Sequence, residues 1–318
     1  MKFNIENPEL KETRQGFADA LVDAGKTNQN LVVLGGDVSG SVKTNLFRDA
    51  YPDRFISVGI AEQDMMGTAA GLALAGKIPV ASAYGEFAAG RPFDQIRQSI
   101  AYSEMNVKIC ASHCGVTVGP DGATHQSFED VGLMRILPHM NVITPCDYNQ
   151  TYRAVRLAID SVGPFYVRFY REASPNFTDN NAPFEFGKAD TLIDGNDITL
   201  IASGLLVWEA IVASERLKKE GIGARVVNMH TIKPIDVKTI VKCAEETGLI
   251  ITCEDHQWTC GLFGAVAEVL AIHKPTKMDF IAINDTFGES AVNAKDLMRK
   301  YQIDSEAIYN KVKKHLKK

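Results

Sequence analysis

The sequence predicts a protein of two α/β domains, each with a mostly parallel sheet covered by helices. Three observations support this. Apolar runs of strand length alternate with helix-like segments through the first half of the chain, and the alternation restarts after a polar stretch between Pro175 and Asp190. The length of 318 residues also leaves room for two cores. Strands that alternate with helices are typical of covered parallel sheets.

In the first half, short apolar runs predict strands, and longer segments of helical periodicity predict helices between them. The run Leu31 to Leu34 is an example of such a strand, and the Ala- and Gly-rich segment after Glu62 is an example of such a helix. In chain order we expect a helix over 13–24, strands over 31–34 and 55–58, a helix over 63–75, a strand over 78–82, a helix over 91–102, a strand over 107–112, a helix over 128–136, a strand over 141–144, a helix over 148–160 and a strand over 165–169.

The segment that follows is rich in Asn, Pro and Asp and reads as a linker. We therefore predict a first domain over 1–175, a linker over 176–190 and a second domain over 191–318. The second domain should contain a strand over 198–202, a helix over 205–219, a strand over 224–229, a helix over 237–247, a strand over 249–253, a helix over 261–272 and a strand over 279–283. Residues 294–318 read as two polar helices with a solvated Lys run at the end.

Composition narrows the class of protein. Hydrophobic residues make up 45% and charged residues 23%, as in soluble globular proteins, and the net charge of -5 argues against nucleic acid as a partner. The first residues lack the apolar core of a signal peptide and no stretch is long enough to span a bilayer, so we expect a cytoplasmic protein without membrane contact. The six cysteines form no CxxC pair, which predicts reduced, mostly buried thiols and no metal site.

Glu62 is the most informative single residue. It lies between the apolar run 55–60 and a helix rich in Met, Ala and Gly, so that its neighbours on both sides look buried. A buried carboxylate must take up a proton or bind a specific partner. One interpretation is a carboxylate satisfied by the free amides of a helix N-terminus. The other is a ligand contact, because Gly59 and Gly67 allow close approach, and the spacing alone leaves both open.

Two further segments follow predicted strands, where open α/β sheets place their sites. His113 and His125 flank a glycine-rich loop that also contains Asp121, and they are candidates for either structural or catalytic roles, with metal ligation the weaker alternative. Tyr84 and Phe87 are either core residues or an aromatic face for a planar ring. By contrast, the segment 35–44 only half-resembles a phosphate loop, because its Lys-Thr pair stands too far from the glycine.

Four motifs together resemble transketolases, in the same order along nearly the whole chain. They are Gly59-Ile60-Ala61-Glu62, the pair Tyr84 and Phe87, the loop 119–126 (Gly-Pro-Asp-Gly-Ala-Thr-His-Gln) and the segment 228–236 (Asn-Met-His-Thr-Ile-Lys-Pro-Ile-Asp). The resemblance covers only the C-terminal portion of a full-length transketolase. It implies a thiamine-diphosphate pyrimidine-binding domain followed by the smaller transketolase C-terminal α/β domain.

In that family a separate N-terminal domain holds the diphosphate and its divalent metal through a Gly-Asp-Gly motif, which this sequence lacks. The resemblance therefore implies one subunit of a split transketolase of the pentose phosphate pathway. It would be active only with an N-terminal partner subunit that carries a metal such as Mg²⁺. It also implies self-association within a heterotetramer of two such chains and two partners.

The resemblance also implies roles for single residues at the cofactor. Glu62 would hydrogen-bond the pyrimidine nitrogen of thiamine diphosphate and share a proton with the ring, which helps the cofactor form its nucleophilic carbon. Tyr84 and Phe87 would form an aromatic wall around the pyrimidine. Tyr84 stands where Phe is usual in the family, so its hydroxyl needs a hydrogen-bond partner. Asp37 would lie near the cofactor at the subunit interface.

At the substrate, His113 and His125 would assist proton transfers and Asp121 would read the stereochemistry of the donor hydroxyls. The residues that match the sugar-phosphate ligands of the family are Arg14, Ser41 and Arg171. Arg168 is the alternative to Arg171, since both stand near the end of the same predicted strand and a guanidinium suits phosphate.

Two alternatives to a ketol-transferring subunit remain. The beta subunit of a 2-oxoacid dehydrogenase has the same architecture and a similarly placed glutamate, but the His-bearing loop and the arginines favour sugar phosphates. A non-catalytic assembly subunit would bind the partner without turnover, and the presence of Glu62, His113, His125 and Asp121 together argues against it. The motifs do not define the range of donor and acceptor sugars.

Overall fold

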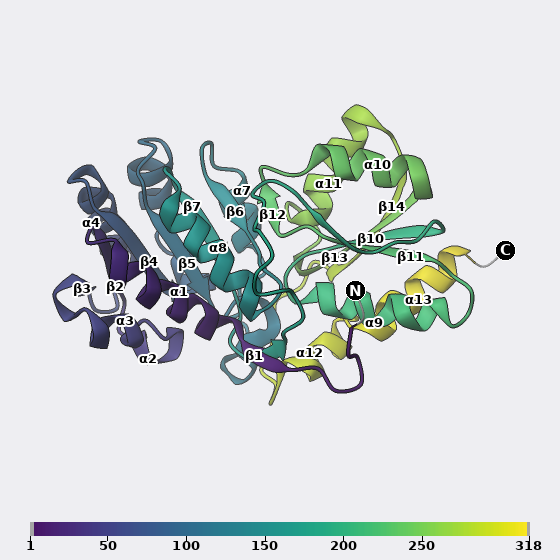
Figure 1. The fold of residues 1–318 in the computed structure, drawn as a ribbon, viewed down its shortest axis with the longest axis horizontal. Helices are drawn as coiled ribbons and strands as arrows, with labels where there is room; N and C mark the ends of the chain where they lie inside the picture. The colour runs from purple at the N-terminus through teal and green to yellow at the C-terminus, as the bar shows by residue number, and fades with distance from the viewer. Residues whose placement is uncertain (1–2, 317–318) are drawn as a thin grey trace.

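The computed structural model describes residues 3–316, which form two α/β domains (Figure 1). The strands in chain order are β1 (Leu10–Glu12), β2 (Leu31–Gly35), β3 (Phe55–Ser57), β4 (Ile78–Tyr84), β5 (Lys108–Ser112), β6 (Asn141–Ile143), β7 (Phe165–Arg168), β8 (Ala173–Pro175), β9 (Asp190–Ile193), β10 (Ile198–Ala202), β11 (Ala224–Asn228), β12 (Thr231–Lys233), β13 (Leu249–Gln257) and β14 (Lys277–Ile283).

Helices separate most of these strands. They are α1 (Thr13–Thr27), α2 (Ser39–Val42), α3 (Asn45–Ala50), the 3-10 helix η1 (Pro52–Arg54), α4 (Glu62–Leu74), α5 (Gly85–Ala89), α6 (Phe93–Gln95), the π-helix η2 (Ile96–Ala101), the 3-10 helix η3 (Gly115–Asp121), α7 (Asp130–Arg135), α8 (Tyr148–Asp160), α9 (Leu206–Lys218), α10 (Val237–Thr247), α11 (Leu262–His273), α12 (Ala294–Lys300) and α13 (Ser305–Leu316).

The first domain is built on a seven-stranded sheet with the order β12-β6-β7-β5-β4-β2-β3. Its neighbouring strands are parallel except for β12, which runs antiparallel to β6. Apolar side chains of α1, α3 and α8, such as Phe17, Phe47 and Val155, form a core with one face. Those of α4, η2 and α7, such as Met65 and Ile100, form a core with the other. The sheet is therefore covered on both faces, as predicted from the alternation.

The second domain has a five-stranded sheet with the order β14-β13-β10-β11-β9, in which only β9 is antiparallel to its neighbour. Figure 1 shows α10 and α11 on one side of this sheet and α9 and α13 on the other. The apolar cluster around α4 and α7 continues into α10 and α11 through Ile232 of β12. Strand β12 therefore ties the second half of the chain to the first sheet.

Most predicted elements are confirmed, with ends that differ by a few residues. The prediction of one regular helix over 91–102 was wrong, because the chain forms the short helix α6 and then the π-helix η2. The short strands β1, β8, β9 and β12 were not predicted, since they contain only three or four residues each. The two terminal helices are present, and the last two lysines lie outside the described residues.

The cysteines are free thiols, as expected. Five of them are buried and Cys260 is exposed. Burial raises the pKa values of Cys110 and Cys253, so these thiols stay protonated near neutral pH. They act as small apolar side chains in the two cores.

Candidate active site

The predicted site residues gather where β2, β4 and β5 end. These strands are parallel neighbours, with Gly35 opposite Ser82 and Tyr84 opposite Ser112. Ser41 lies after β2, Tyr84 ends β4 and is followed by Phe87, and His113 comes directly after β5. The sequence thus places its candidate side chains at the carboxyl edge of the first sheet, where ligands bind in folds of this kind.

Glu62 is the first residue of α4 and is only 3% exposed. Its Oε2 accepts a hydrogen bond of 2.9 Å from Nη1 of Arg91, whose side chain is 47% exposed. The same guanidinium lies 4.3 Å from the centre of the Phe87 ring. Within this chain Arg91 therefore compensates the buried charge of Glu62.

Tyr84 and Phe87 form an aromatic wall together with the two histidines. The rings of Tyr84 and His113 stack at 4.2 Å, and those of Tyr84 and Phe87 lie 6.2 Å apart at 25°. His125 meets Phe87 edge-on at 5.0 Å. The two histidines, 12 positions apart in the sequence, are thus brought to the same pair of aromatic rings.

The backbone of the loop explains how the histidines reach this position. His113 has a φ of +60°, which is strained for a residue with a side chain and is typical of functional sites. Gly119 and Gly122 have φ values of +63° and +76°, which glycine adopts readily. Asp121, between them, is exposed, while Nδ1 of His125 lies 2.9 Å from the Thr124 hydroxyl.

The hydroxyl of Tyr84 has a hydrogen-bond partner, as we expected from the sequence. It donates to Oγ of Ser41 at 2.9 Å, and that oxygen lies 3.0 Å from Nε2 of His113. The other ring nitrogen, Nδ1, lies 2.8 Å from Oγ of the buried Ser112. Burial, assisted by Arg14 and Arg171, lowers the pKa of His113 to about 3, so its imidazole is neutral at physiological pH.

A cluster of basic side chains lies beside Ser41. Arg14 donates from Nη1 to the Ser41 carbonyl at 2.8 Å, and its Nε is buried without a hydrogen-bond partner among residues 3–316. Glu12 pairs with Arg14 and with Lys43, at 2.8 Å in each case. Arg171 donates to the Val118 carbonyl at 2.8 Å and remains partly exposed. The cations outnumber the single carboxylate, so the cluster suits an anion.

Arg168 has a different environment from Arg171. It is 2% exposed and pairs with Asp130 of α7 at 2.9 Å and with Asp255 of β13 at 2.7 Å. Tyr170 also contacts both Arg168 and Asp255. The charge of Arg168 is thus neutralised in an ion network between the two domains. Of these two arginines, Arg171 is the one whose side chain is accessible to a ligand.

Asp37 follows β2, is exposed and has a φ of +62°. The structure adds four residues that the sequence did not single out: Arg91, Ser112, Glu12 and Lys43. Ser112 follows from its place beside His113, but the other three become visible only through contacts between segments distant in the chain. The residues described include no cluster of three His, Cys, Asp or Glu side chains suited to a metal ion.

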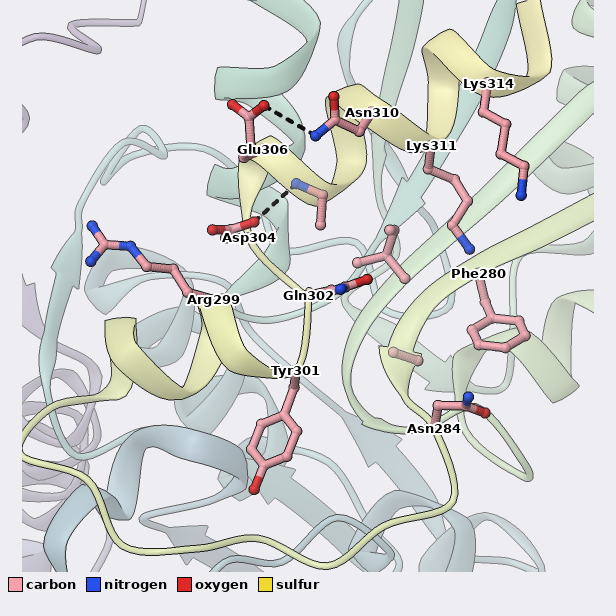
Figure 2. Close-up of a pocket in the computed structure, with 13 residues that line it drawn as sticks. Phe280, Asn284, Arg299, Tyr301, Gln302, Asp304, Glu306, Asn310, Lys311 and Lys314 are labelled. Carbon is pink, nitrogen blue, oxygen red and sulfur yellow. Dashed lines mark hydrogen bonds between the residues drawn. The ribbon is translucent and has the colours of Figure 1, made fainter.

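A separate pocket of about 610 Å³ lies in the second domain between β14, α12 and α13 (Figure 2). Its charges are mixed, since its lining contains Arg299, Lys311 and Lys314 as well as Asp304 and Glu306. Lys311 already pairs with Asp279, and Glu306 bonds Asn310. The pocket therefore differs from the strand edge of the first domain, where the cations converge beside a hydroxyl and a histidine.

Comparisons with known proteins agree with this architecture. A sequence model of the transketolase pyrimidine-binding domain matches residues 10–176, and one of the transketolase C-terminal domain matches residues 187–308. A "Putative transketolase C-terminal section" from Methanocaldococcus jannaschii is 45% identical over 97% of both chains. One of the subunits of an apulose-4-phosphate transketolase from Phocaeicola vulgatus is 40% identical over 96% of this chain and 97% of its own.

A solved structure described as a split gene transketolase, inactive beta4 tetramer, superposes with a TM-score of 0.87 at 42% identity, covering 95% of this chain and 97% of the other. The rat transketolase is 36% identical over 95% of this chain, which spans only 48% of the rat protein.

The fold and these matches define a protein of two α/β domains, a pyrimidine-binding domain of the transketolase type followed by a transketolase C-terminal domain. The chain belongs to the transketolase family and corresponds to its C-terminal half. No helix within residues 3–316 is both long and apolar enough to cross a membrane.

Proposed function

We propose that this chain is the C-terminal subunit of a two-chain transketolase. The enzyme would transfer a two-carbon ketol unit from a ketose phosphate of the xylulose 5-phosphate type to an aldose phosphate, as in the pentose phosphate pathway. The observation that carries the proposal is the buried carboxylate of Glu62 at a strand edge that also presents aromatic rings, two histidines and a basic cluster. Homologues named for other sugars make the donor and acceptor the least constrained part of the proposal.

The residues around Glu62 fit the pyrimidine end of thiamine diphosphate. The carboxylate is buried, but its partner in this chain is the half-exposed Arg91, so a protonated ring nitrogen can replace the guanidinium without leaving a buried charge unpaired. The faces of Phe87 and Tyr84 suit a planar heterocycle. When bound, thiamine diphosphate would supply the nucleophilic carbon that attacks the ketose and carries the two-carbon unit.

The chain's own residues would bind and orient the substrate. Glu62 would hold the proton on the pyrimidine nitrogen. Arg14, Arg171 and Ser41 would bind the phosphate, and Asp121 would contact a donor hydroxyl. His125 would exchange protons with the sugar hydroxyls from its place beside Phe87. His113, neutral because of burial, would act first as a hydrogen-bonding group, and a bound phosphate dianion would increase its affinity for a proton by offsetting the two arginines.

A partner subunit completes the proposal. The rat enzyme is twice as long as the matched region, and the relatives of matching length are described as a subunit or a section. We infer that an N-terminal partner holds the diphosphate and a divalent cation such as Mg²⁺, and that two copies of each chain assemble as a heterotetramer. Asp37, exposed at the same edge, would lie near the cofactor at the subunit interface.

The test is reconstitution of this chain with its cognate N-terminal subunit, thiamine diphosphate and Mg²⁺. The pair should convert xylulose 5-phosphate and ribose 5-phosphate, with apulose 4-phosphate as a competing donor to define the sugar. Glu62→Gln should lose most activity and bind the cofactor more weakly by titration calorimetry. Asp64→Asn removes an exposed carboxylate from the same helical turn and should do neither. Wild-type cofactor affinity in Glu62→Gln, or turnover of 2-oxoacids alone, would refute the proposal.

A further inference from the structure

Four polar groups form a continuous chain across the candidate site. Their order is Tyr84, Ser41, His113 and Ser112, with contacts of 2.9, 3.0 and 2.8 Å. Each of the three hydroxyls carries one proton, and the neutral imidazole carries one more, on either of its nitrogens. The directions of these hydrogen bonds decide which group still has a proton to offer to a ligand.

The proton of Ser112 fixes one end of the chain. This side chain is fully buried, and among residues 3–316 its hydroxyl has only Nδ1 of His113 as a hydrogen-bond partner. If Nδ1 carried the imidazole proton, the proton of Ser112 would be buried without an acceptor, which is costly. Ser112 therefore donates to Nδ1, and the imidazole proton resides on Nε2.

The hydroxyl of Ser41 then accepts two hydrogen bonds. One comes from Nε2 of His113 and the other from the hydroxyl of Tyr84. Both lone pairs of the oxygen are used, so Ser41 can neither accept more nor send its own proton back along the chain. That proton remains free, and a hydroxyl that accepts two bonds is polarised into a stronger donor.

The free proton lies in the basic cluster. Arg14 binds the carbonyl of Ser41, and its unpartnered Nε is buried nearby. Arg14 and Arg171 both act electrostatically on the ring of His113, whose Nε2 contacts this hydroxyl. A phosphate held by the two guanidinium groups would need a neutral donor of this kind for a remaining oxygen.

We propose that Tyr84 and Ser112 are positioning residues for the substrate phosphate: they fix the protons of His113 and Ser41 so that the Ser41 hydroxyl donates to the anion. Neither side chain touches the phosphate itself. The inference rests on the proposed function for its ligand, a sugar phosphate, but its proton directions belong to this chain alone. Tyr84 would thus strengthen phosphate binding through Ser41.

The proton directions can be tested without catalysis. In the ¹⁵N-histidine spectrum of the full chain, the resonances of His113, assigned by their loss in His113→Gln, should show a protonated Nε2 and a bare Nδ1. Ser112→Ala removes the donor to Nδ1 and should move the proton to that nitrogen, whereas Ser82→Ala, a buried serine one strand away, should not. A protonated Nδ1 in the wild-type chain would overturn the inference.

Kinetics of the reconstituted pair test the consequence. Ser112→Ala should raise KM for xylulose 5-phosphate about five- to ten-fold, because Ser41 would then donate to Nε2 of His113 and the phosphate would lose one hydrogen bond. Tyr84→Phe should raise KM less, because Ser41 keeps its proton and loses only the polarisation. For both variants the loss should be smaller with unphosphorylated xylulose, which has no phosphate for the Ser41 hydroxyl to bind. Equal losses with both sugars would show a merely structural role and overturn the inference.

Failure of the proposed function would be seen separately. If the wild-type pair catalyses no ketol transfer, that function falls, and calorimetric titration of inorganic phosphate into the full chain takes the place of kinetics. Weaker phosphate binding in Tyr84→Phe and Ser112→Ala than in wild type and Ser82→Ala would still support the positioning role. Equal affinities in all four would overturn it.

Discussion

Arg91 Nη1 lies 2.9 Å from Glu62 Oε2 and joins a half-exposed cation to a buried anion. The glutamate side chain is 4% exposed and the arginine side chain 47% exposed. A guanidinium at such a position returns to water at little cost, whereas the carboxylate cannot remain alone. Arg91 therefore has the properties expected of a counter-ion that leaves when a pyrimidine nitrogen donates to Glu62.

The first prediction concerns Arg91→Met, which keeps an apolar stem against Phe87 and removes the charge. Without the arginine, Glu62 is buried and unpaired in the cofactor-free chain, so the melting temperature should fall. Thiamine diphosphate should restore it and bind the reconstituted pair up to about five-fold more tightly, since a half-exposed ion pair contributes at most about 1 kcal/mol.

Thermal melts and calorimetry with and without cofactor measure both effects. The control is Arg97→Met, an exposed arginine on the π-helix that makes no ion pair with Glu62. Weaker cofactor binding in Arg91→Met would contradict the displacement and make Arg91 a cofactor ligand itself.

The parts of the fold that depend on neighbouring residues were predicted from the sequence, and those that depend on contacts between distant residues were not. The alternation of strands and helices depends on local pattern, and it located α1, α4 and α8 to within a few residues. Strand β12 has three residues and pairs with a strand about ninety positions away, so no local pattern marks it. The interruption of the helix over 91–102 also escaped prediction, because residues 96–101 keep helical periodicity in a π-helix.

The same reasoning applies to the site. The order of the motifs in the sequence singled out Glu62, Tyr84 and His113. The parallel strands place these residues at the carboxyl edge of the first sheet. The pairing of Glu62 with Arg91 depends on how the chain turns at Gly90, between the two short helices α5 and α6. The burial of Arg168 depends on Asp255, from the other domain. Long-range electrostatic partners are what a single sequence does not show.

The second prediction separates the two arginines near the end of β7. Arg168→Met leaves Asp130 and Asp255 buried without their counter-ion and should lower the free energy of unfolding by about 3–5 kcal/mol. Arg171→Met should change it by less than about 0.5 kcal/mol, yet should raise KM for a sugar phosphate. Urea denaturation and kinetics of both variants provide the measurement, and a stable Arg168→Met with weakened phosphate binding would reverse the two roles.

The third prediction concerns Lys108, which is fully buried at the start of β5. Its Nζ donates to Asn106 Oδ1, the Ser161 carbonyl and the Gly163 carbonyl at 2.7–2.8 Å, and so joins the turn after α8 to the sheet. Lys108→Met leaves these acceptors without their donor and should cost about 1–3 kcal/mol. Lys77→Met, which removes one 3.3 Å contact at the surface, should cost less than about 0.5 kcal/mol.

Lys108 also gives a pH signature. Burial lowers its pKa to about 7, below the value of 10.5 for an exposed lysine. Between these values the unfolded chain binds more protons than the folded one, so this residue makes stability rise as pH increases from 7 toward 10.5. Urea midpoints measured across this pH range should rise more in wild type than in Lys108→Met. Parallel curves for the two proteins would contradict a lowered pKa for Lys108.

The fourth prediction concerns Glu254 of β13, which is buried against the start of α11. Its Oε2 accepts from the Leu262 amide at 2.6 Å and its Oε1 from the Phe263 amide at 2.8 Å. Burial raises its pKa to about 8, above the ordinary value of 4.5. Between pH 4.5 and 8 the folded chain therefore holds a proton that the unfolded chain has released, and this contribution to stability is lost as pH rises through that window.

Glu254→Gln cannot titrate, so comparison with it isolates the effect. Relative to this variant, wild type should lose stability from about pH 5 to about pH 8, with a slope of at most about 1.4 kcal/mol per pH unit. Urea denaturation at each unit of pH measures the slope. Glu268→Gln changes an exposed carboxylate on α11 and should give a curve parallel to that of wild type. A slope of the opposite sign would mean that the two amides, together with Arg168, hold Glu254 ionised in the fold, in which case the helix N-terminus outweighs burial at this position.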